Sequence, residues 1–162
     1  MKPEPVSIET RTAQPVLSVR SVVAIHDLGQ NHAERFEAIA TYLQSHDVRP
    51  AGRPYVRYHT FDDDETDVEV GIPLHSAGAP ADDQLRPGQL PGGTMVVAWH
   101  DGEDRRLGEA YARISSAIDE GGYERNGPAW EVYHWLDLSG HDQPDPDLPR
   151  IQLVQPVVAG PA

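Results

Sequence analysis

One carboxylate lies in the middle of a segment rich in strand-forming residues. Glu131 stands between Trp130 and Val132, and the alternation of side chains along a strand puts it on one face with Tyr133 and Trp135. A carboxylate in a strand interior must be solvated, paired or turned towards a cavity, because its burial alone is costly. Glu131 is therefore the first candidate for contact with a ligand. The alternative is an ordinary glutamate that faces solvent on an open sheet.

Aromatic side chains form the second group of candidates: Tyr58, Trp99, Tyr133 and Trp135. Tyr58 and Tyr133 occupy matching positions of two similar segments, so we expect them to lie symmetrically on one face. Aromatic walls with one carboxylate suit planar or cationic organic molecules through stacking and cation–π contact. The alternative is that the rings fill the core. This alternative is favoured for Tyr111, on the apolar stripe of a helix, and for Trp130, on the strand face opposite Glu131.

Two His-Asp pairs, His26-Asp27 and His100-Asp101, stand at what the repeat described below predicts to be equivalent strand ends. Local hydrogen bonding at a strand-to-helix turn explains the aspartates better than metal binding or catalysis does, because no third ligand has a recognisable spacing. The acidic run 62–65 lacks the spacing of a calcium loop. No nucleophile elbow, phosphate loop or dinucleotide fingerprint is present. We therefore expect neither a metal nor a cofactor.

The composition limits the function classes. The 162 residues suffice for one domain with a substantial core. Twenty-six acidic against 13 basic residues give a net charge of −13, which argues against a nucleic-acid partner. Cysteine is absent, so disulfides and thiolate chemistry are excluded. No apolar run reaches about 20 residues and the N-terminus has no apolar signal region, so we expect a cytoplasmic chain with no membrane partner.

The elements that must position the candidates occur twice in the same order. The pattern of each half predicts a strand, a helix and two further strands. In the first half these are strand 16–25, strands 55–61 and 68–74, and between them a helix with an apolar face at Phe36, Ile39, Ala40 and Leu43. In the second half they are strand 95–100, helix 107–118 and strands 129–136 and 151–157. Segments 24–27, 52–59 and 68–73 resemble 98–101, 127–134 and 151–156 in sequence. Asn31 with Glu34 predicts a capping arrangement for the first helix. Three similarities in the same order indicate an internal repeat.

The repeat predicts an α+β fold, a tandem β-α-β-β arrangement with pseudo-twofold symmetry. We expect one antiparallel sheet with both helices on one face and a ligand cleft on the other. The predicted domain covers residues 16–157, with halves 16–74 and 94–157 and a linker loop over 75–93. Residues 1–15 are predicted to be a flexible N-terminal arm, and 139–147 a polar loop.

The second half resembles the GyrI-like small-molecule-binding family, the effector-binding domain also found in AraC-type and MerR-type regulators. The similar pieces are His100-Asp101-Gly102, the stripe from Leu107 to Ile118, the segment from Gly121 to Tyr133, and the closing strand 151–157. The resemblance extends over about residues 16–157. It departs at Gly102-Glu-Asp104 and Gly29-Gln-Asn31, where the family often has an aromatic residue, which makes this pocket more polar there.

The resemblance implies a pocket in which a glutamate at position 131 meets cationic ligands. We therefore expect binding of a hydrophobic small molecule, either cationic or neutral, for sensing, sequestration or resistance. Some members of the family hydrolyse cyclopropane-bearing natural products, and for that reaction Glu131 would be the general base, helped by Tyr133. The sequence leaves open which of the two holds. Namesake members inhibit DNA gyrase, although no residue here supports a protein partner. With no helix-turn-helix ahead of residue 16, we expect a freestanding domain.

Overall fold

The structure, a computed structural model, describes residues 5–101, 107–139 and 150–161. The first half of the described chain contains β1 (Val6–Arg11), β2 (Gln14–Ala24), a 3-10 turn (Ile25–Asp27), α1 (Leu28–Ser45), β3 (Tyr55–Phe61) and β4 (Glu65–Pro73). The second half contains β5 (Arg86–Leu90), β6 (Gly93–His100), α2 (Leu107–Gly121), β7 (Tyr123–Arg125), β8 (Trp130–Tyr133) and β9 (Ile151–Ala159). The α+β class expected from the repeat is confirmed.

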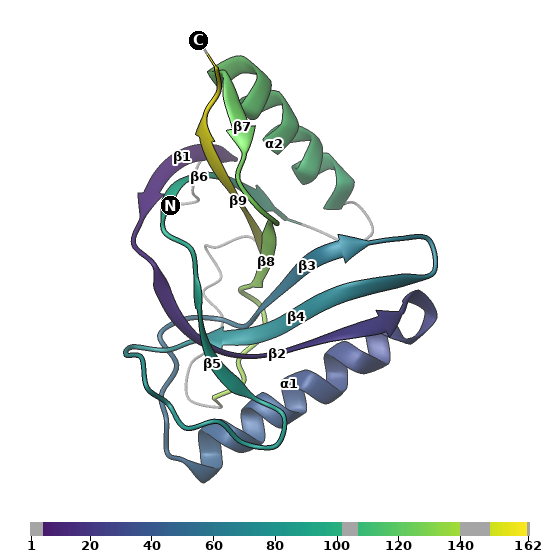
Figure 1. The fold of residues 1–162 in the computed structure, drawn as a ribbon, viewed down its shortest axis with the longest axis vertical. Helices are drawn as coiled ribbons and strands as arrows, with labels where there is room; N and C mark the ends of the chain where they lie inside the picture. The colour runs from purple at the N-terminus through teal and green to yellow at the C-terminus, as the bar shows by residue number, and fades with distance from the viewer. Residues whose placement is uncertain (1–4, 102–106, 140–149, 162) are drawn as a thin grey trace.

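All strands belong to one curled antiparallel sheet. Its order is β1-β6-β9-β8-β3-β4-β2-β5, and β7 pairs with β9 outside this path. The order is symmetric about its centre: β3 and β8 lie side by side, β4 and β9 flank them, and β2 and β6 follow (Figure 1). The two halves therefore join through their equivalent strands, as the repeat predicts.

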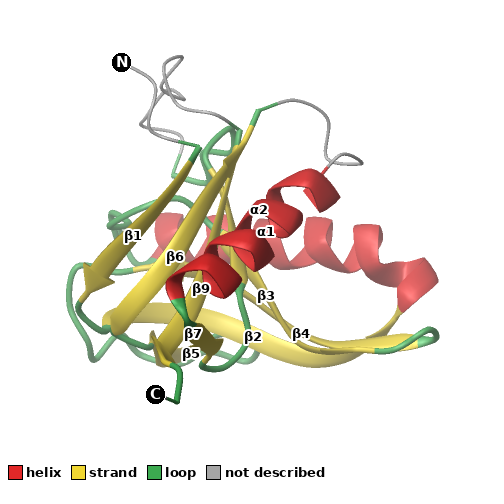
Figure 2. Cartoon of the chain, turned by 90° about the horizontal axis from the view of Figure 1, so that it is seen from above, coloured by secondary structure: helices red, strands yellow, loops and turns green. Residues whose placement is uncertain are grey.

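Both helices pack on one face of the sheet. Apolar side chains of α1 and α2, among them Ile39, Leu43, Ile114 and Ile118, share one buried core with sheet residues such as Leu153. Helix α1 packs over β2 and β4, and α2 packs over β6 and β9 (Figure 2). The central pair β3–β8 lies between the two helices. This arrangement is what positions the candidate site.

A second, smaller core lies on the opposite face. It joins Tyr55 and Trp130 to Leu90, Met95 and Val154. Trp130 was predicted to be a core residue on the face opposite Glu131, and it is 3% exposed there. The sheet is therefore apolar on both faces, because its curl and the connection from β1 to β2 close the inner side.

The register at the centre of the sheet fixes the symmetry of the halves. Val56 of β3 is the ladder partner of Glu131 of β8. The two residues are also repeat-equivalent, so the pseudo-twofold axis passes between them. Side chains of opposed residues on one face lie about 4.5–5.5 Å apart at Cβ. Tyr58 and Tyr133 follow two positions along each strand and so lie on opposite sides of the axis.

The His-Asp pairs are not equivalent, so that prediction is wrong. His100 ends β6 opposite Ile151, whereas the repeat-equivalent position opposite Val68 holds Ser21. His26 lies beyond β2 in the 3-10 turn and its side chain is exposed, while His100 is buried. The first strand continues further than the sixth, and this extra length moves His26 out of the sheet.

Two segments predicted to be irregular contain strands. Val6–Arg11, inside the predicted arm 1–15, pairs with β6 along its whole length. Arg86–Leu90, inside the predicted linker 75–93, pairs with β2. Val6 and Ile8 alternate with polar residues in β1, whereas β5 contains Pro87 and Gly88 and shows no alternation. Both strands lie at an edge of the sheet.

Helix boundaries differ from the predictions at the first helix only. Helix α1 begins at Leu28, its N-cap residue Asp27 makes no side-chain capping bond, and Asn31 is buried within the helix. The Asn31–Glu34 cap is therefore wrong. Gly122 follows α2 at φ +68°, the left-handed conformation that favours glycine at this position. Gly102 and residues 140–147 of the predicted polar loop lie outside the described residues. Neither described helix is long and apolar enough to span a membrane.

Candidate functional site

Glu131 is buried on the helix-bearing face of the sheet, with 6% of its surface exposed. Strand β8 holds it at the centre of the sheet, beside Val56 of β3. The hydroxyl of Tyr133 donates a hydrogen bond to its Oε1 at 2.7 Å. The hydroxyl of Tyr111, from α2, donates to its Oε2 at 2.5 Å. Both carboxylate oxygens thus accept a bond from a phenol, which keeps a buried carboxylate tolerable.

Aromatic rings from both halves surround this carboxylate. Phe36 of α1 meets Tyr133 edge to face, with ring centroids 6.1 Å apart. Tyr58 of β3 packs edge to face on Phe61 at 5.5 Å. These contacts have the edge-on geometry that aromatic quadrupoles prefer. We name the region formed by Phe36, Tyr58, Tyr111, Glu131 and Tyr133 the central groove.

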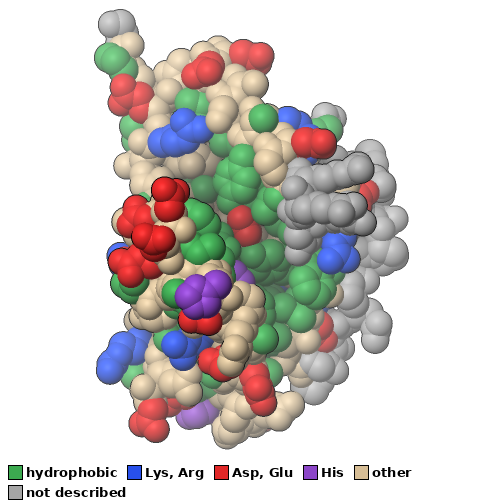
Figure 3. All heavy atoms as spheres, turned by 90° about the vertical axis from the view of Figure 1, so that its right-hand side faces the viewer, with side chains coloured by type: hydrophobic (Ala, Val, Ile, Leu, Met, Phe, Trp, Pro, Cys, Tyr) green, Lys and Arg blue, Asp and Glu red, His purple; other side chains and the backbone are tan. Residues whose placement is uncertain are grey.

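The surface over this region is hollowed. Figure 3 shows hydrophobic side chains gathered around a depression, with an acidic side chain inside it. Several aromatic rings nearby remain open to solvent, with Phe61 60%, Tyr111 36% and Trp135 38% exposed. Because α1 and α2 pack over the flanking strands, the central pair of strands is left accessible from this side. Apolar rings around a recessed acid are an arrangement typical of ligand sites.

His32 adds a polar nitrogen to the α1 side of the groove. Its ring centroid lies 6.2 Å from that of Tyr58 and 6.3 Å from that of Phe36. Within the described residues its buried Nε2 has no hydrogen-bond partner. Burial lowers the pKa of His32 below its ordinary value, so the ring is neutral at pH 7. A neutral imidazole adds no positive charge to compete with a cation near Glu131.

The three tyrosines of the groove stay protonated at neutral pH. Burial, followed by the negative charge of Glu131, raises the pKa of Tyr58, Tyr111 and Tyr133 above the ordinary value of 10.0. A phenol that cannot ionise remains a hydrogen-bond donor. The groove therefore combines one carboxylate with neutral, polarisable walls.

The structure brings three of the five predicted site residues together: Tyr58, Glu131 and Tyr133. Trp135 lies just beyond the end of β8, with its ring 6.2 Å from Tyr133 and the Arg150 guanidinium 4.9 Å above it. Trp99 does not join them. It alternates with Ala98, which faces the helices, and its ring packs on His134 at 5.0 Å on the opposite face.

The predicted face of the site residues needs a correction. Glu131 accepts a bond from helix α2, so the predicted residues lie on the face that carries the helices rather than on the opposite face. The physical reason is the curl of the sheet. The helices cover its outer strands and diverge over the centre, which leaves the groove between them.

Three residues of the groove were missed by sequence reasoning: His32, Phe36 and Tyr111. Tyr111 was assigned to the core because it falls on the apolar stripe of its helix. Its ring lies at the edge of that stripe and its hydroxyl reaches Glu131. A tyrosine at the margin of an otherwise aliphatic stripe is the one signal that points to it. The apolar periodicity of α1 included Phe36 but gave it no role beyond the core.

Metal ligation has no support in the described part of the chain. No group of three or more His, Asp or Glu side chains there is arranged to hold an ion. The described residues of the central groove can compensate a charge, form hydrogen bonds and stack on aromatic rings, and Glu131 can accept a proton.

The sequence and the fold were compared with known proteins. A family model described as GyrI-like small molecule binding domain matches residues 4–143. No match was found among curated proteins. The C-terminal domain of EcmrR has a similar structure, with a TM-score of 0.72 at 17% identity over 95% of this chain and 97% of that chain. EcmrR bound to DNA gives a TM-score of 0.73 at 16% identity over 95% of this chain, which spans 57% of that chain.

Two further structures share the fold at 10% identity. A hydrolase encoded by lin2189 from Listeria innocua has a TM-score of 0.59, with 94% of this chain and 91% of that chain covered. SAV2435 bound to tetraphenylphosphonium has a TM-score of 0.57, with 94% and 93% covered. At these identities the likeness shows the fold alone.

Proposed function

The chain belongs to the GyrI-like small-molecule-binding domain family, and we propose that it binds a hydrophobic organic cation in the central groove, with Glu131 as the counter-charge. The observation that carries the proposal is a buried carboxylate held between two tyrosine hydroxyls and ringed by aromatic side chains. Sensing, sequestration and resistance are uses of the same binding step.

Charge is the first argument. A buried carboxylate lies in surroundings where Coulomb attraction is stronger than in water. Glu131 is such a carboxylate, and it would attract a cationic guest into the central groove. His32 is neutral and the tyrosines are protonated at pH 7, so these groove residues carry no positive charge that would repel a cation.

Shape and polarisability are the second argument. The faces of Tyr and Phe rings attract a cation within about 6 Å of their centroids. Phe36, Tyr58 and Tyr133 offer such rings from two sides of the axis. The fold neighbour SAV2435 binds tetraphenylphosphonium, a cation with four phenyl rings. That ligand supports a cationic aromatic guest for this chain and is the natural probe.

The experiment is a calorimetric titration of wild type and Glu131→Gln with tetraphenylphosphonium and with neutral triphenylphosphine oxide. The substitution keeps the shape and removes the charge. The cation should bind about 10- to 150-fold more weakly, equal to about 1.5–3 kcal/mol, while the neutral compound changes by less than about twofold.

A matched control is Glu120→Gln, which removes the same charge from an exposed position near the end of α2. Its affinity for both compounds should equal that of wild type. Equal losses for both compounds in Glu131→Gln would give Glu131 a packing role instead. An unchanged cation affinity in that variant would place binding outside the groove.

A hydrolytic reaction at the same carboxylate is the second candidate. The fold neighbour from Listeria innocua is a hydrolase, and the Glu131–Tyr133 contact of 2.7 Å could orient a water for attack. Against it, both oxygens of Glu131 already accept phenol bonds, which lowers their basicity. Turnover of a cyclopropane-bearing alkylating compound, lost in Glu131→Gln, would favour hydrolysis. The cation titration measures binding alone, without turnover, so it tests the binding function separately from hydrolysis.

The predicted partners follow from the same residues. A net charge of −13 opposes binding to duplex DNA, and the DNA-bound neighbour EcmrR is a longer chain. We therefore expect the small molecule to be the partner of the described domain. A cytoplasmic location remains a prediction.

A further inference from the structure

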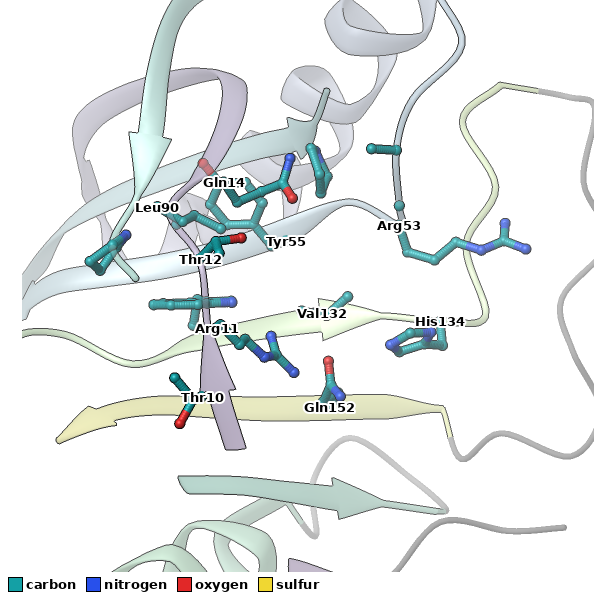
Figure 4. Close-up of a pocket in the computed structure, with 15 residues that line it drawn as sticks. Thr10, Arg11, Thr12, Gln14, Arg53, Tyr55, Leu90, Val132, His134 and Gln152 are labelled. Atoms are coloured by element: carbon teal, nitrogen blue, oxygen red, sulfur yellow. The ribbon is translucent and has the colours of Figure 1, made fainter. Parts of the chain in front are cut away.

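A second cavity of about 510 Å³ lies on the sheet face opposite the central groove (Figure 4). Its floor is formed by Tyr55, Trp130 and Val132 from the central strands, and the connection from β1 to β2 closes one side through Thr12 and Gln14, which are among its lining residues. The volume is in the usual range for sites that bind small organic molecules. Neither Glu131 nor the tyrosines that bond to it line this cavity.

The charge of the lining is the reverse of the charge of the chain. Among the described residues that line the cavity are two arginines, Arg11 and Arg53, and no aspartate or glutamate, although acidic residues outnumber basic ones by 26 to 13 in the chain. The carboxylates that pair with these arginines, Glu9 and Asp137, lie outside the lining. In Figure 4 the Arg11 side chain extends over the strands towards Gln152. The described lining of the cavity is therefore basic, and each of its arginines pairs with a carboxylate beside the cavity.

The pKa of His134, on the wall of the same cavity, is affected by both arginines. Its Nε2 is buried and has no hydrogen-bond partner within the described residues. Burial lowers the pKa of His134, a hydrogen bond to Gln152 partly opposes this, and the charges of Arg53 and Arg11 lower the pKa further. Both arginines thus act on one point of the cavity wall. The imidazole stays neutral at pH 7 and can donate or accept a hydrogen bond.

Apolar and aromatic side chains share the remaining walls with the polar residues Thr10, Thr12, Gln14 and Gln152. Trp130 is 3% exposed beneath the Arg57 guanidinium, which lies 5.3 Å above its ring. Leu90 and Val132 complete an apolar surface. A ligand for this cavity must therefore combine a flat or aliphatic body with an anionic group that reaches Arg11.

We propose that this cavity is a second binding site, which takes an organic anion: a carboxylate or sulfonate on an aromatic or aliphatic body. The arginine guanidinium provides the charge-assisted donors that such an anion prefers. The site is independent of the central groove, since the sheet separates the two and their charges are opposite. One domain would then bind a cation and an anion on its two faces.

The test uses two fluorescent probes that differ by one charge. The probe 8-anilinonaphthalene-1-sulfonate carries the anion, and N-phenyl-1-naphthylamine has the same ring system without it. Arg11→Gln should weaken the sulfonate about tenfold and leave the neutral probe within about twofold. Arg53→Gln should weaken it less, about threefold, because the Arg53 side chain is less exposed than that of Arg11, at 18% against 31%.

Arg20→Gln is the matched control, since Arg20 pairs with Asp67 on the surface as Arg11 pairs with Glu9, outside the cavity. It should leave sulfonate binding unchanged, and so should saturation with tetraphenylphosphonium. Circular dichroism melting of each variant checks that the fold persists. An equal loss in Arg20→Gln, displacement of the sulfonate by the cation, or no binding of the sulfonate to wild type would each overturn the proposal.

Discussion

The two halves of the domain are alike in their backbone and different at their centre. Both run strand, helix, strand, strand, and their equivalent strands pair across the axis. At the axis the first half contributes Val56 and the second half Glu131, which are ladder partners. The symmetric fold thus builds a groove from both halves, whereas the group that gives the groove its charge comes from one of them.

The flanking tyrosines show the same pattern at a smaller scale. Tyr133 is 9% exposed and donates to Glu131 at 2.7 Å. Its equivalent, Tyr58, is half-buried and packs on His32 and Phe61. The negative charge of Glu131 helps to raise the pKa of Tyr58. Equivalent positions have therefore kept their residue type while taking different roles. In this fold, therefore, the pseudo-twofold symmetry determines where equivalent residues lie. The residue type at single positions, such as Glu131 opposite Val56, determines the chemistry of the groove.

The largest expected effect on stability comes from a substitution that places a carboxylate on both sides of the axis. Val56→Glu would place a second carboxylate beside Glu131, at a position that is 0% exposed. An uncompensated buried charge costs on the order of 3–5 kcal/mol, so the free energy of unfolding in urea should fall by about that amount.

The control for this variant is Val22→Glu. Val22 lies in β2 and is 62% exposed, so the same substitution there should change the free energy of unfolding by less than about 1 kcal/mol. A loss below about 1 kcal/mol for Val56→Glu would mean that the axis is hydrated, and the electrostatic argument for cation binding would fail with it.

A smaller effect compares the two equivalent tyrosines. Tyr133→Phe removes a hydrogen bond to Glu131 and should lower the free energy of unfolding by about 1 kcal/mol. Tyr58→Phe removes a hydroxyl from a half-buried ring and should cost less than half of that. Urea titrations at pH 7 measure both. Equal losses would show that the two positions are energetically symmetric, contrary to the roles assigned here.

The repeat could be predicted from the sequence because the patterns that indicate it lie within short segments of the chain. Apolar periodicity placed both helices and the central strands, and the matched segments predicted two halves related by pseudo-twofold symmetry. The edge strands β1 and β5 were missed because β1 follows the proline-containing segment 1–5 and β5 itself contains Pro87 and Gly88. Both strands pair with a neighbour, β6 and β2, that is far away in sequence. The false equivalence of His26 and His100 arose because short similar segments do not reveal where strand β2 continues.

The groove was predicted in part, for reasons that lie in three dimensions. Glu131 and Tyr133 follow from strand alternation, and Tyr58 from the repeat. The face of the groove and the role of Tyr111 depend on how far α1 and α2 diverge across the curled sheet, which no local pattern records. Trp99 was included as an aromatic residue near a strand end, yet alternation along β6 directs it to the opposite face.

The most direct test of the proposed cation site is a crystal structure of the protein with tetraphenylphosphonium bound. We expect the phosphorus atom between α1 and α2, with phenyl rings packed on Tyr58 and Tyr133 and the cation within about 6 Å of those ring centroids. The Glu131 carboxylate should face it. A cation found in the cavity lined by Arg11 and Trp130, or only on the surface, would contradict the assignment of the central groove as the cation site.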